Sequence, residues 1–290
     1  IIIETDTGYR NPVKKIEQKA YDIILNEQQR QVSENIKKTM DFRNDSKPNI
    51  HLIHGITGSG KTEVYIDLID YTISKGKAVI VLIPEIALTY QTVMRFTRRF
   101  GDRVSIINSR LSKGERYDQF ERAKNGDVDI MIGPRSALFT PFKNLGLIII
   151  DEEHESAYKS ESVPKYHATE VAIKRAKDVG ATLVLGSATP SVESYYRAKN
   201  GAYKLHVLNK REKGNLPEVH VVDLREELKN ENKSIFSIEL QNLIKDRLEK
   251  QQQTMLFINR RGYAGFVSCR DCGEAIKCPH CDVTLKLHRN

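Results

Sequence analysis

Short runs of Val, Ile and Leu, almost without polar residues, return along most of the chain, and helical patterns fill the gaps between them. Such runs are typical of a parallel sheet, because a strand that is covered on both faces has no solvent side. Strands and helices alternating at this spacing predict a doubly wound α/β domain. The expected strands span residues 49–54, 78–83, 104–107, 128–132, 145–150 and 182–185.

Glycines and one cap sequence mark the ends of the predicted helices. The helical patterns at residues 63–75, 89–100 and 167–179 each stop at a glycine, which readily adopts the left-handed conformation of a helix end. Ser112 and Glu115 have the spacing of a capping box, so they predict the start of another helix.

The pattern loosens after about residue 200. A polar stretch with Gly and Pro at 209–217 indicates a connector. Beyond it lie an apolar run at 219–222, a helical pattern near 237–250 and an expected strand at 254–258. We interpret these elements as the start of a second α/β lobe.

Composition narrows the classes of protein that remain. None of the apolar runs in the 290 residues approaches the 18 or so that a membrane helix needs, so we expect no membrane partner. Residues 1–6 have no start methionine, basic segment or long apolar stretch, which indicates an internal fragment without a signal peptide. The net charge of +8 favours a polyanionic partner. Because all four cysteines fall in the last 22 residues, we expect a reduced, cytoplasmic protein with a local metal module.

A complete phosphate-loop sequence, G-x-x-x-x-G-K-[ST], stands between an expected strand and an expected helix, which is the context that this motif requires. Its glycines let backbone N–H groups surround phosphate oxygens at the positive end of the helix dipole. Lys61 is expected to reach the β- and γ-phosphates of ATP, and Thr62 to bind Mg²⁺. The alternative, a Gly/Ser turn with a chance lysine, does not explain this context. The expected ATP-binding residues are Gly55, Ile56, Thr57, Gly58, Ser59, Gly60, Lys61 and Thr62.

A run of carboxylates, Asp151-Glu152-Glu153-His154, follows the expected strand 145–150 directly. The carboxyl end of a buried parallel strand is where such a sheet completes a Mg²⁺ site. Asp151 is therefore the expected metal ligand, and Glu152 the expected group that orients the attacking water. Taken alone, the run could equally be an acidic helix start. Together with the phosphate loop, it predicts an ATPase whose catalytic residues are Lys61, Asp151 and Glu152.

These motifs resemble the superfamily 2 (DEAH-like) helicases, whose second motif reads D-E-x-H. Further stretches resemble one family among them, the primosomal replication-restart helicases (the PriA, or primosomal protein N′, family). The stretches that carry this resemblance are 57–65, 84–89, 135–146, 151–154, 186–190 and 259–263.

The resemblance implies the organisation and activity of the chain. A linker at 1–24 would precede a RecA-like P-loop NTPase lobe at 25–208; residues 209–268 would hold a connector and the start of a second RecA-like lobe, and 269–290 a truncated zinc-binding module. It also implies a nucleoid-associated, ATP-dependent helicase or translocase that moves 3′ to 5′ on branched and single-stranded DNA in replication restart. Single-stranded DNA-binding protein and other primosome proteins would be its partners. The alternative function is a fork-binding and partner-loading platform with incidental ATPase activity.

The resemblance further assigns roles to individual residues. Gln28 or Gln29 would read adenine, with the register uncertain by one residue. Residues 92–116 carry seven Lys or Arg against two Asp or Glu, which favours phosphate contact beside the DNA motifs. Asn108 stands where the family usually has a histidine. The expected DNA contacts are Pro84, Glu85, Thr89, Arg95, Arg135, Ser136 and Tyr166. The residues expected to couple hydrolysis to DNA movement are His154, Ser187, Ala188 and Thr189.

The four cysteines form two C-x₂-C pairs: Cys269 with Cys272, and Cys278 with Cys281. Two such pairs could bind one Zn²⁺, although the five residues between them are fewer than usual. The resemblance instead implies two half-sites, whose partner pairs would lie beyond residue 290. It also implies that a second-lobe arginine finger lies outside these residues, so we expect the chain to bind nucleotide but to hydrolyse it slowly.

Overall fold

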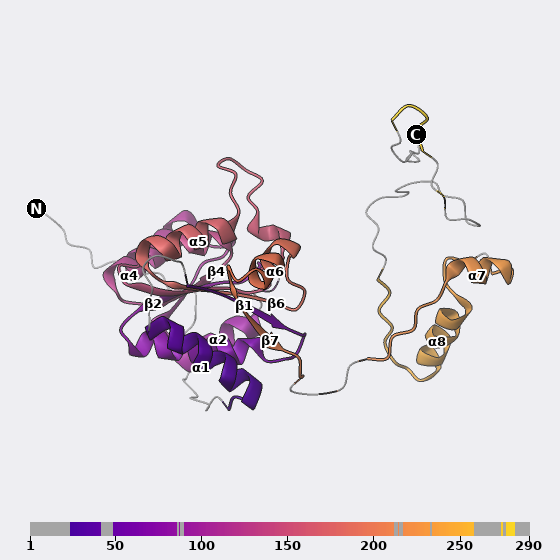
Figure 1. Cartoon of the computed structure of the whole chain (residues 1–290), viewed down its shortest axis with the longest axis horizontal. Helices are drawn as coiled ribbons and strands as arrows, with labels where there is room; N and C mark the ends of the chain where they lie inside the picture. The colour runs from indigo at the N-terminus through magenta and orange to yellow at the C-terminus, as the bar shows by residue number, and fades with distance from the viewer. Residues whose placement is uncertain are drawn as a thin grey trace, which may run out of the picture. The chain divides into compact units, whose positions relative to one another are not determined.

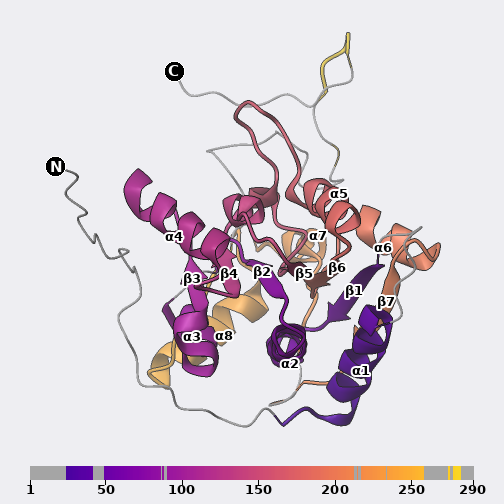
Figure 2. The ribbon, with the colours of Figure 1, turned by 90° about the vertical axis from the view of Figure 1, so that its left-hand side faces the viewer.

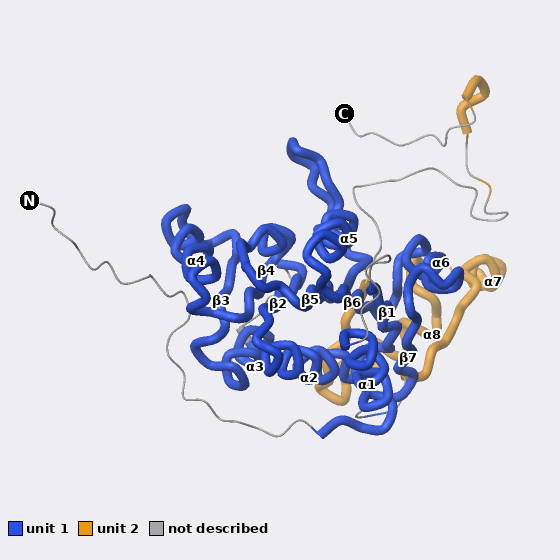
Figure 3. Tube along the Cα trace, turned by 60° about the vertical axis from the view of Figure 1, so that its left-hand side comes forward, with its two compact units in different colours: residues 1–215 blue, residues 216–290 orange. Residues whose placement is uncertain are grey.

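The computed structural model describes residues 24–41, 49–85, 87, 90–211, 214, 217–232, 234–257, 274 and 277–281 (Figure 1). The chain divides into two compact units, Ile1–Asn215 and Leu216–Asn290 (Figure 3). Each unit is described by itself.

The first unit is built on a parallel sheet of seven strands in the order β3-β4-β2-β5-β6-β1-β7. This confirms the predicted doubly wound α/β architecture. Six strands correspond to the apolar runs of the sequence, and their side chains are almost all buried. The strands are β1 (Asn49–Gly55), β2 (Ala78–Leu82), β3 (Val104–Ile106), β4 (Ile130–Gly133), β5 (Leu145–Ile150), β6 (Thr182–Ser187) and β7 (Lys204–Leu208).

β7 is the strand that the sequence analysis missed. It pairs in parallel with β1 at the end of the sheet order, where four of its five residues are at least partly exposed. A strand at an edge needs no continuous aliphatic run, because one side of it faces solvent.

Helices cover both faces of the sheet (Figures 1 and 2). On one face, side chains of α1 (Glu27–Asp41), α2 (Lys61–Ser74) and α3 (Tyr90–Phe100) share a core with the sheet. On the other face lie α4 (Lys113–Asn125), α5 (Ala168–Val179) and α6 (Val192–Lys199). The two apolar cores on either side of one sheet explain why its strands are aliphatic throughout.

Local sequence determines where these helices begin and end. The Ser112–Glu115 capping box forms as predicted, with both reciprocal hydrogen bonds present at the start of α4. Gly180 ends α5 in the left-handed conformation (φ 66°), and short 3₁₀ turns at Gly101–Arg103, Arg135–Phe139 and Ser156–Tyr158 make further connections.

The second unit contains α7 (Leu224–Lys229) and α8 (Ile238–Glu249), and α8 agrees with the predicted helix. The described part of the run 254–258 is not a strand, which corrects that expectation, and the apolar run at 219–222 is not a strand either. Val221 is 93% exposed and Met255 94% exposed. An apolar run becomes a strand only where another strand can pair with it, and the described part of this unit contains none.

Within the described residues, no helix combines the length and apolar character that crossing a membrane requires.

Candidate active site

The phosphate loop lies between β1 and α2, as the motif predicts. Gly58 (φ 80°) and Gly60 (φ 76°) adopt the left-handed conformation that bends the loop, and the Ser59 N–H donates to the carbonyl of Ile56 at 3.0 Å. Lys61 opens α2, and its Nζ donates to the carbonyl of Gly55 at 2.9 Å. The side chain of the motif lysine is thus folded over the loop that would hold the phosphates.

Two elements outside the motif support this loop. The Ile56 N–H donates to the carbonyl of Leu208 at the end of β7, at 3.1 Å. Gln29 in α1 is fully buried, and its Nε2 donates to the carbonyl of Ser59 at 2.9 Å. Gln28, the other candidate for reading adenine, donates to Asn209 Oδ1 at 2.8 Å in an exposed position. The glutamine that contacts the phosphate loop is therefore Gln29, and adenine contact by Gln28 stays a prediction.

Asp151 follows β5 directly, and its backbone N–H donates to the carbonyl of Leu82 at 2.9 Å. Burial, followed by the charge of Glu152, raises the pKa of the Asp151 carboxyl to about 6. Glu152 has a positive φ of 47°, which is unusual for a residue with a side chain. Because its ionised form is unfavourable here, the Asp151 carboxylate would be stabilised by a bound cation.

Two tyrosines, neither given a role by the sequence analysis, hold Asp151. The fully buried Tyr65 donates from its hydroxyl to Asp151 Oδ1 at 3.0 Å. Tyr158 donates to the backbone carbonyl of Asp151 at 2.6 Å. At Gly186, an added Cβ would lie only 1.6 Å from the Tyr65 hydroxyl, so glycine is required there. Nothing in the spacing of these tyrosines indicates these contacts, because they join four different elements.

The residues expected to couple hydrolysis to DNA movement come together. His154 Nδ1 lies 2.7 Å from Ser187 Oγ, and His154 Nε2 lies 3.5 Å from Thr189 Oγ1. Ala188 stands between these two partners in the chain. His154 Nδ1 also lies 3.7 Å from the carboxylate of Glu152. One imidazole therefore contacts both the end of β6 and the expected water-orienting carboxylate.

Glu153, the variable position of the D-E-x-H motif, has a role that the sequence analysis missed. Its buried carboxylate accepts hydrogen bonds from the Ser191 N–H at 2.7 Å, the Ser191 hydroxyl at 3.2 Å and the Ser194 hydroxyl at 2.9 Å. Its own N–H donates to the carbonyl of Gly186 at 3.0 Å. Glu153 therefore fastens the motif to the first turn of α6.

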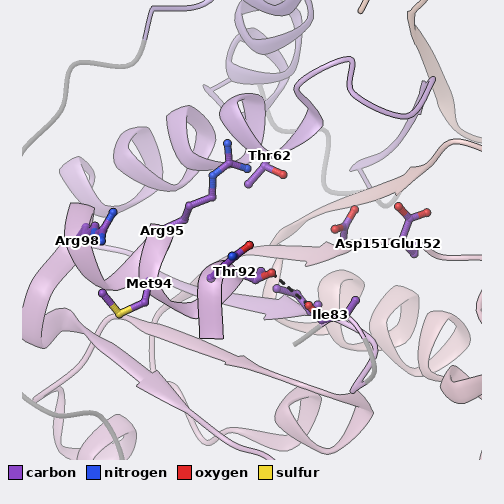
Figure 4. A pocket seen from close by; sticks show the side chains of 10 residues that line it. Thr62, Ile83, Thr92, Met94, Arg95, Arg98, Asp151 and Glu152 are labelled. Atoms are coloured by element: carbon purple, nitrogen blue, oxygen red, sulfur yellow. Dashed lines mark hydrogen bonds between the residues drawn. The ribbon is translucent and has the colours of Figure 1, made fainter. Parts of the chain in front are cut away.

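A cavity of about 480 Å³ lies between the motif residues and α3 (Figure 4). Thr62 lines it from the start of α2, Asp151 and Glu152 from the end of β5, and Arg95 and Arg98 from α3. Arg95 was expected to contact DNA, but the structure sets it in this cavity, apart from the other DNA candidates.

A second cavity, of about 320 Å³, brings together four of the expected DNA contacts: Pro84, Glu85, Arg135 and Ser136. Asn108 lines it too. Glu85 accepts from the Ser109 N–H at 2.9 Å, and hydrogen bonds from Ser109 lower the pKa of the Glu85 carboxyl. Arg135 donates to the carbonyls of Ala157 and Lys159, at 3.1 and 2.7 Å. The contacts from three separate stretches give this surface a defined shape.

Two of the other DNA candidates are located differently. Tyr166 packs edge-to-face against Phe139, with ring centroids 5.5 Å apart, in the hairpin that projects before α5 (Figure 1). Thr89 lies outside the described residues.

Half of the expected zinc ligands can be described. Cys278 is half-buried and Cys281 exposed, both are free thiols, and Cys269 and Cys272 lie outside the described residues. A hydrogen bond from the His280 backbone, followed by one from the Cys281 thiol, lowers the pKa of the Cys278 thiol. A lowered thiol pKa suits a metal ligand, although the described residues contain no cluster of three or more groups that could hold a metal.

The phosphate loop and the acidic motif fit Mg²⁺ and a nucleoside triphosphate. Ser59 Oγ is buried in the loop without a hydrogen-bond partner among the described residues. An unpaired polar atom beside a turn of backbone N–H groups suits a polar ligand there. Thr62 and Asp151 would hold the cation, and Lys61 the phosphates.

Comparison with known proteins identifies the family. The model of the ResIII family, described as the res subunit of type III restriction enzymes, matches residues 22–192, which is more than half of the chain. The chain belongs to this family. The first-lobe residues described above, from α1 to the start of α6, lie within the match.

Curated relatives show which proteins within the family this chain is similar to. Replication restart protein PriA of Bacillus subtilis (strain 168) is 49% identical over 286 residues, covering 97% of this chain and 35% of the relative. The PriA protein of Synechocystis sp. is 49% identical over 243 residues, covering 82% of this chain and 29% of the relative. The resemblance to the PriA family is thereby confirmed. The chain spans about a third of the length of these relatives.

A solved structure agrees with the fold. The helicase MrfA, in a crystal structure bound to DNA and AMPPNP, matches 78% of this chain and 32% of its own, with a TM-score of 0.50 and 18% sequence identity. At this identity the match bears on the fold alone, and it confirms the RecA-like helicase architecture.

Proposed function

We propose that the chain is the ATP-binding core of an ATP-dependent DNA helicase or translocase. One observation supports this most: Thr62 from the phosphate loop and the carboxylates Asp151 and Glu152 from the end of β5 line a single cavity. These groups have the roles that phosphoryl transfer needs, namely metal binding and orientation of the attacking water.

The roles in hydrolysis follow from these positions. On nucleotide binding, Lys61 would exchange the carbonyl of Gly55 for the β- and γ-phosphates. A cation held by Thr62 and Asp151 would compensate the buried charge of the Asp151 carboxylate. Glu152 orients water, and His154 carries the state of this carboxylate to Ser187 and Thr189 at the end of β6. Mg²⁺ supplies charge neutralisation when it is bound.

DNA would run along the second cavity. Arg135 and Ser136 lie there beside Pro84 and Glu85, and the neighbouring Arg116 adds another positive charge. Phosphate contacts of this kind hold a strand without reading its sequence. The loops that line the cavity follow β2 and β4, at the same carboxyl edge of the sheet as the proposed ATP site. A change in the position of one loop can therefore displace residues of the other site.

The biological setting comes from the PriA relatives. We propose that the longer protein acts on branched DNA in replication restart, moves 3′ to 5′, and works with single-stranded DNA-binding protein and other primosome proteins. Zinc bound by the two cysteine pairs belongs to the same proposal, and the zinc content of the purified chain before and after Cys278→Ser would test it.

The experiment that tests the function uses Lys61→Ala, with Lys75→Ala as the matched control. Lys75 lies at the far end of α2 and pairs with Asp41. We expect Lys61→Ala to weaken Mg·ATP binding by at least tenfold, measured by titration calorimetry, since a charge-assisted phosphate contact is lost. Lys75→Ala should bind as the unaltered chain does.

The same substitution in the full-length protein separates the two functions considered. A motor with Lys61→Ala cannot restart replication, whereas a loading platform with incidental ATPase activity still can. Restart that survives Lys61→Ala would therefore contradict the proposed motor.

A further inference from the structure

The basic run of α3 is the sequence feature that the proposed function leaves unexplained. Its three arginines point to three different environments. Arg99 makes two hydrogen bonds to Asp70 Oδ2 on α2, at 3.0 and 2.7 Å. Arg98 is exposed and lines the first cavity at the end away from Thr62 (Figure 4). Arg95 lies in the same cavity, close to Thr62.

Arg95 is held in the cavity by one ion pair. Its Nη2 donates to Glu63 Oε1 at 2.8 Å, and its side chain is 51% exposed. Glu63 directly follows the expected Mg²⁺ ligand Thr62 in the first turn of α2. The guanidinium of Arg95 is therefore held by the residue next to Thr62, near the expected position of the metal and the terminal phosphates.

The guanidinium of Arg95 has donors left to bind a phosphate at this position. A guanidinium has five N–H donors in a planar fork, and the contact with Glu63 occupies one of its nitrogens. The remaining donors can bind oxygens that enter the cavity, and bidentate binding of phosphate is a favoured geometry for arginine. The Arg95 side chain is 51% exposed and Glu63 only 16% exposed, so the guanidinium is free to turn towards a phosphate, and the exchange takes one partner from a partly buried carboxylate.

The arrangement of the other residues indicates which phosphate would enter. The loop amides and Lys61 lie at the start of α2, whereas Asp151 and Glu152 lie across the cavity from Arg95 (Figure 4). Thr62 and Asp151 would hold the metal, which would neutralise negative charge on the last phosphates. The terminal phosphate is thus the part of the nucleotide that reaches between the carboxylates and α3.

We propose that Arg95 is a γ-phosphate-binding residue supplied by the first lobe itself, which distinguishes a nucleoside triphosphate from a diphosphate. In the diphosphate and nucleotide-free states it pairs with Glu63, and in the triphosphate state it binds the terminal phosphate. This inference rests on the proposed nucleotide site and adds a specificity residue to it.

Titration of the chain with Mg·AMPPNP and with Mg·ADP tests the proposal. Arg95→Ala is expected to weaken binding of AMPPNP by roughly tenfold and to leave the affinity for ADP within about twofold, as expected for loss of one charge-assisted contact. Arg95→Lys keeps the charge without the fork and should give an intermediate loss. Glu63→Gln releases Arg95 and should raise the ratio of AMPPNP to ADP affinity.

Two neighbouring arginines on α3 control for charge. Arg99→Ala removes the same charge from α3 outside the cavity, and Arg98→Ala removes it at the far end of the cavity. Both should leave the ratio of the two affinities within about twofold, because Arg98 is exposed at the far end of the cavity and the charge of Arg99 is compensated by Asp70.

The outcomes separate this inference from the proposed function. An Arg95→Ala chain that binds both nucleotides as before, or loses both equally, would overturn the role of Arg95 while the nucleotide site stands. An unaltered chain that binds neither nucleotide would overturn both. If Arg98→Ala or Arg99→Ala lowered the preference for AMPPNP as much as Arg95→Ala does, the effect would come from the net charge of α3. That result would overturn the assignment to Arg95.

Discussion

At the scale of single residues, the buried carboxylate of Asp151 lowers the free energy of unfolding at the position where a metal ligand is expected. Burial and the charge of Glu152 raise the pKa of its carboxyl to about 6, well above the 3.8 of a free side chain. Compared with the unfolded chain, the folded protein disfavours the ionised carboxylate, which is still the main form at pH 7, and this lowers the free energy of unfolding. Tyr65 offsets part of this cost by donating a hydrogen bond.

We predict that Asp151→Asn stabilises the nucleotide-free chain and removes Mg²⁺-dependent nucleotide binding. The amide has no charge to bury and can still accept from Tyr65, so the free energy of unfolding at pH 7 should rise by about 1 kcal/mol. Binding of Mg·ATP should fall by at least tenfold, since a metal ligand is lost. Urea unfolding and calorimetry measure the two effects.

Asp127→Asn is the matched control, because this carboxylate is exposed on the loop that follows α4. It should change neither quantity appreciably. A less stable Asp151→Asn chain, or one that still binds nucleotide in a Mg²⁺-dependent way, would contradict the argument from burial.

At the scale of elements, Glu153 fastens the acidic motif to α6. Its buried carboxylate satisfies one backbone N–H and two hydroxyls at the start of that helix. Its neighbour His154 contacts the end of β6 at the same time. The strand β5, the loop after β6 and α6 are therefore expected to move as one body when the ATP site changes.

Glu153→Ala should lower the free energy of unfolding by about 3 kcal/mol, because buried donors lose a charged acceptor. Glu153→Gln keeps an acceptor and should cost about half as much. Urea unfolding monitored by circular dichroism measures the difference. Glu193→Ala, an exposed position in the first turn of α6, should stay within about 0.5 kcal/mol of the unaltered chain. Equal effects of Glu153→Ala and Glu193→Ala would show that α6 is not anchored in this way.

At the scale of the whole first unit, a pair of histidines, one buried and one half-buried, links the last strand to the sheet. His51 Nδ1 in β1 lies 2.9 Å from His206 Nε2 in β7, and the rings stack. Burial lowers the pKa of His51 to about 3, with the charges of His206 and Lys204 adding to the effect. Burial lowers the pKa of His206 to about 4. Both imidazoles are therefore neutral in the folded protein at every pH above about 5.

This pair predicts that mild acid weakens the fold. Unfolded histidine binds a proton below about pH 6.5, whereas the folded pair does not until about pH 4, so the unfolded state binds more protons in this range. Each histidine should lower the free energy of unfolding by about 2 kcal/mol between pH 7 and pH 5. Protonation of Asp151, whose pKa in the folded protein is about 6, offsets roughly 1 kcal/mol of this loss, so the net fall should be about 2 to 3 kcal/mol.

Two variants show whether the fall in the free energy of unfolding comes from the pair of His51 and His206. His206→Asn removes one titrating group of the pair, so the decline between pH 7 and pH 5 should become shallower. His220→Asn, in the second unit, changes an exposed histidine and should leave the decline as it was. A decline of the same slope in His206→Asn would assign the acid sensitivity to other groups.

Much of this architecture was open to prediction, because the signals concerned are local. A strand covered on both faces must be aliphatic, so the runs at 78–83 and 145–150 indicate β2 and β5 directly. The phosphate loop is equally local, since its glycines, lysine and threonine act through the backbone of one turn. The edge strand β7 gave no such signal, and the run at 254–258 suggested a strand that the described residues do not form.

By itself, the sequence determined the doubly wound sheet, the phosphate loop and the acidic motif after β5, because each depends on neighbours in the chain. Only the tertiary structure decided that Gln29 rather than Gln28 holds the loop, that Tyr65 fits beneath Gly186, and that Arg95 lies in the nucleotide cavity. These contacts join residues about 30 to 120 positions apart, and the packing of helices on the sheet sets which of them meet. Side-chain direction at such contacts is a property of packing, which no local pattern contains.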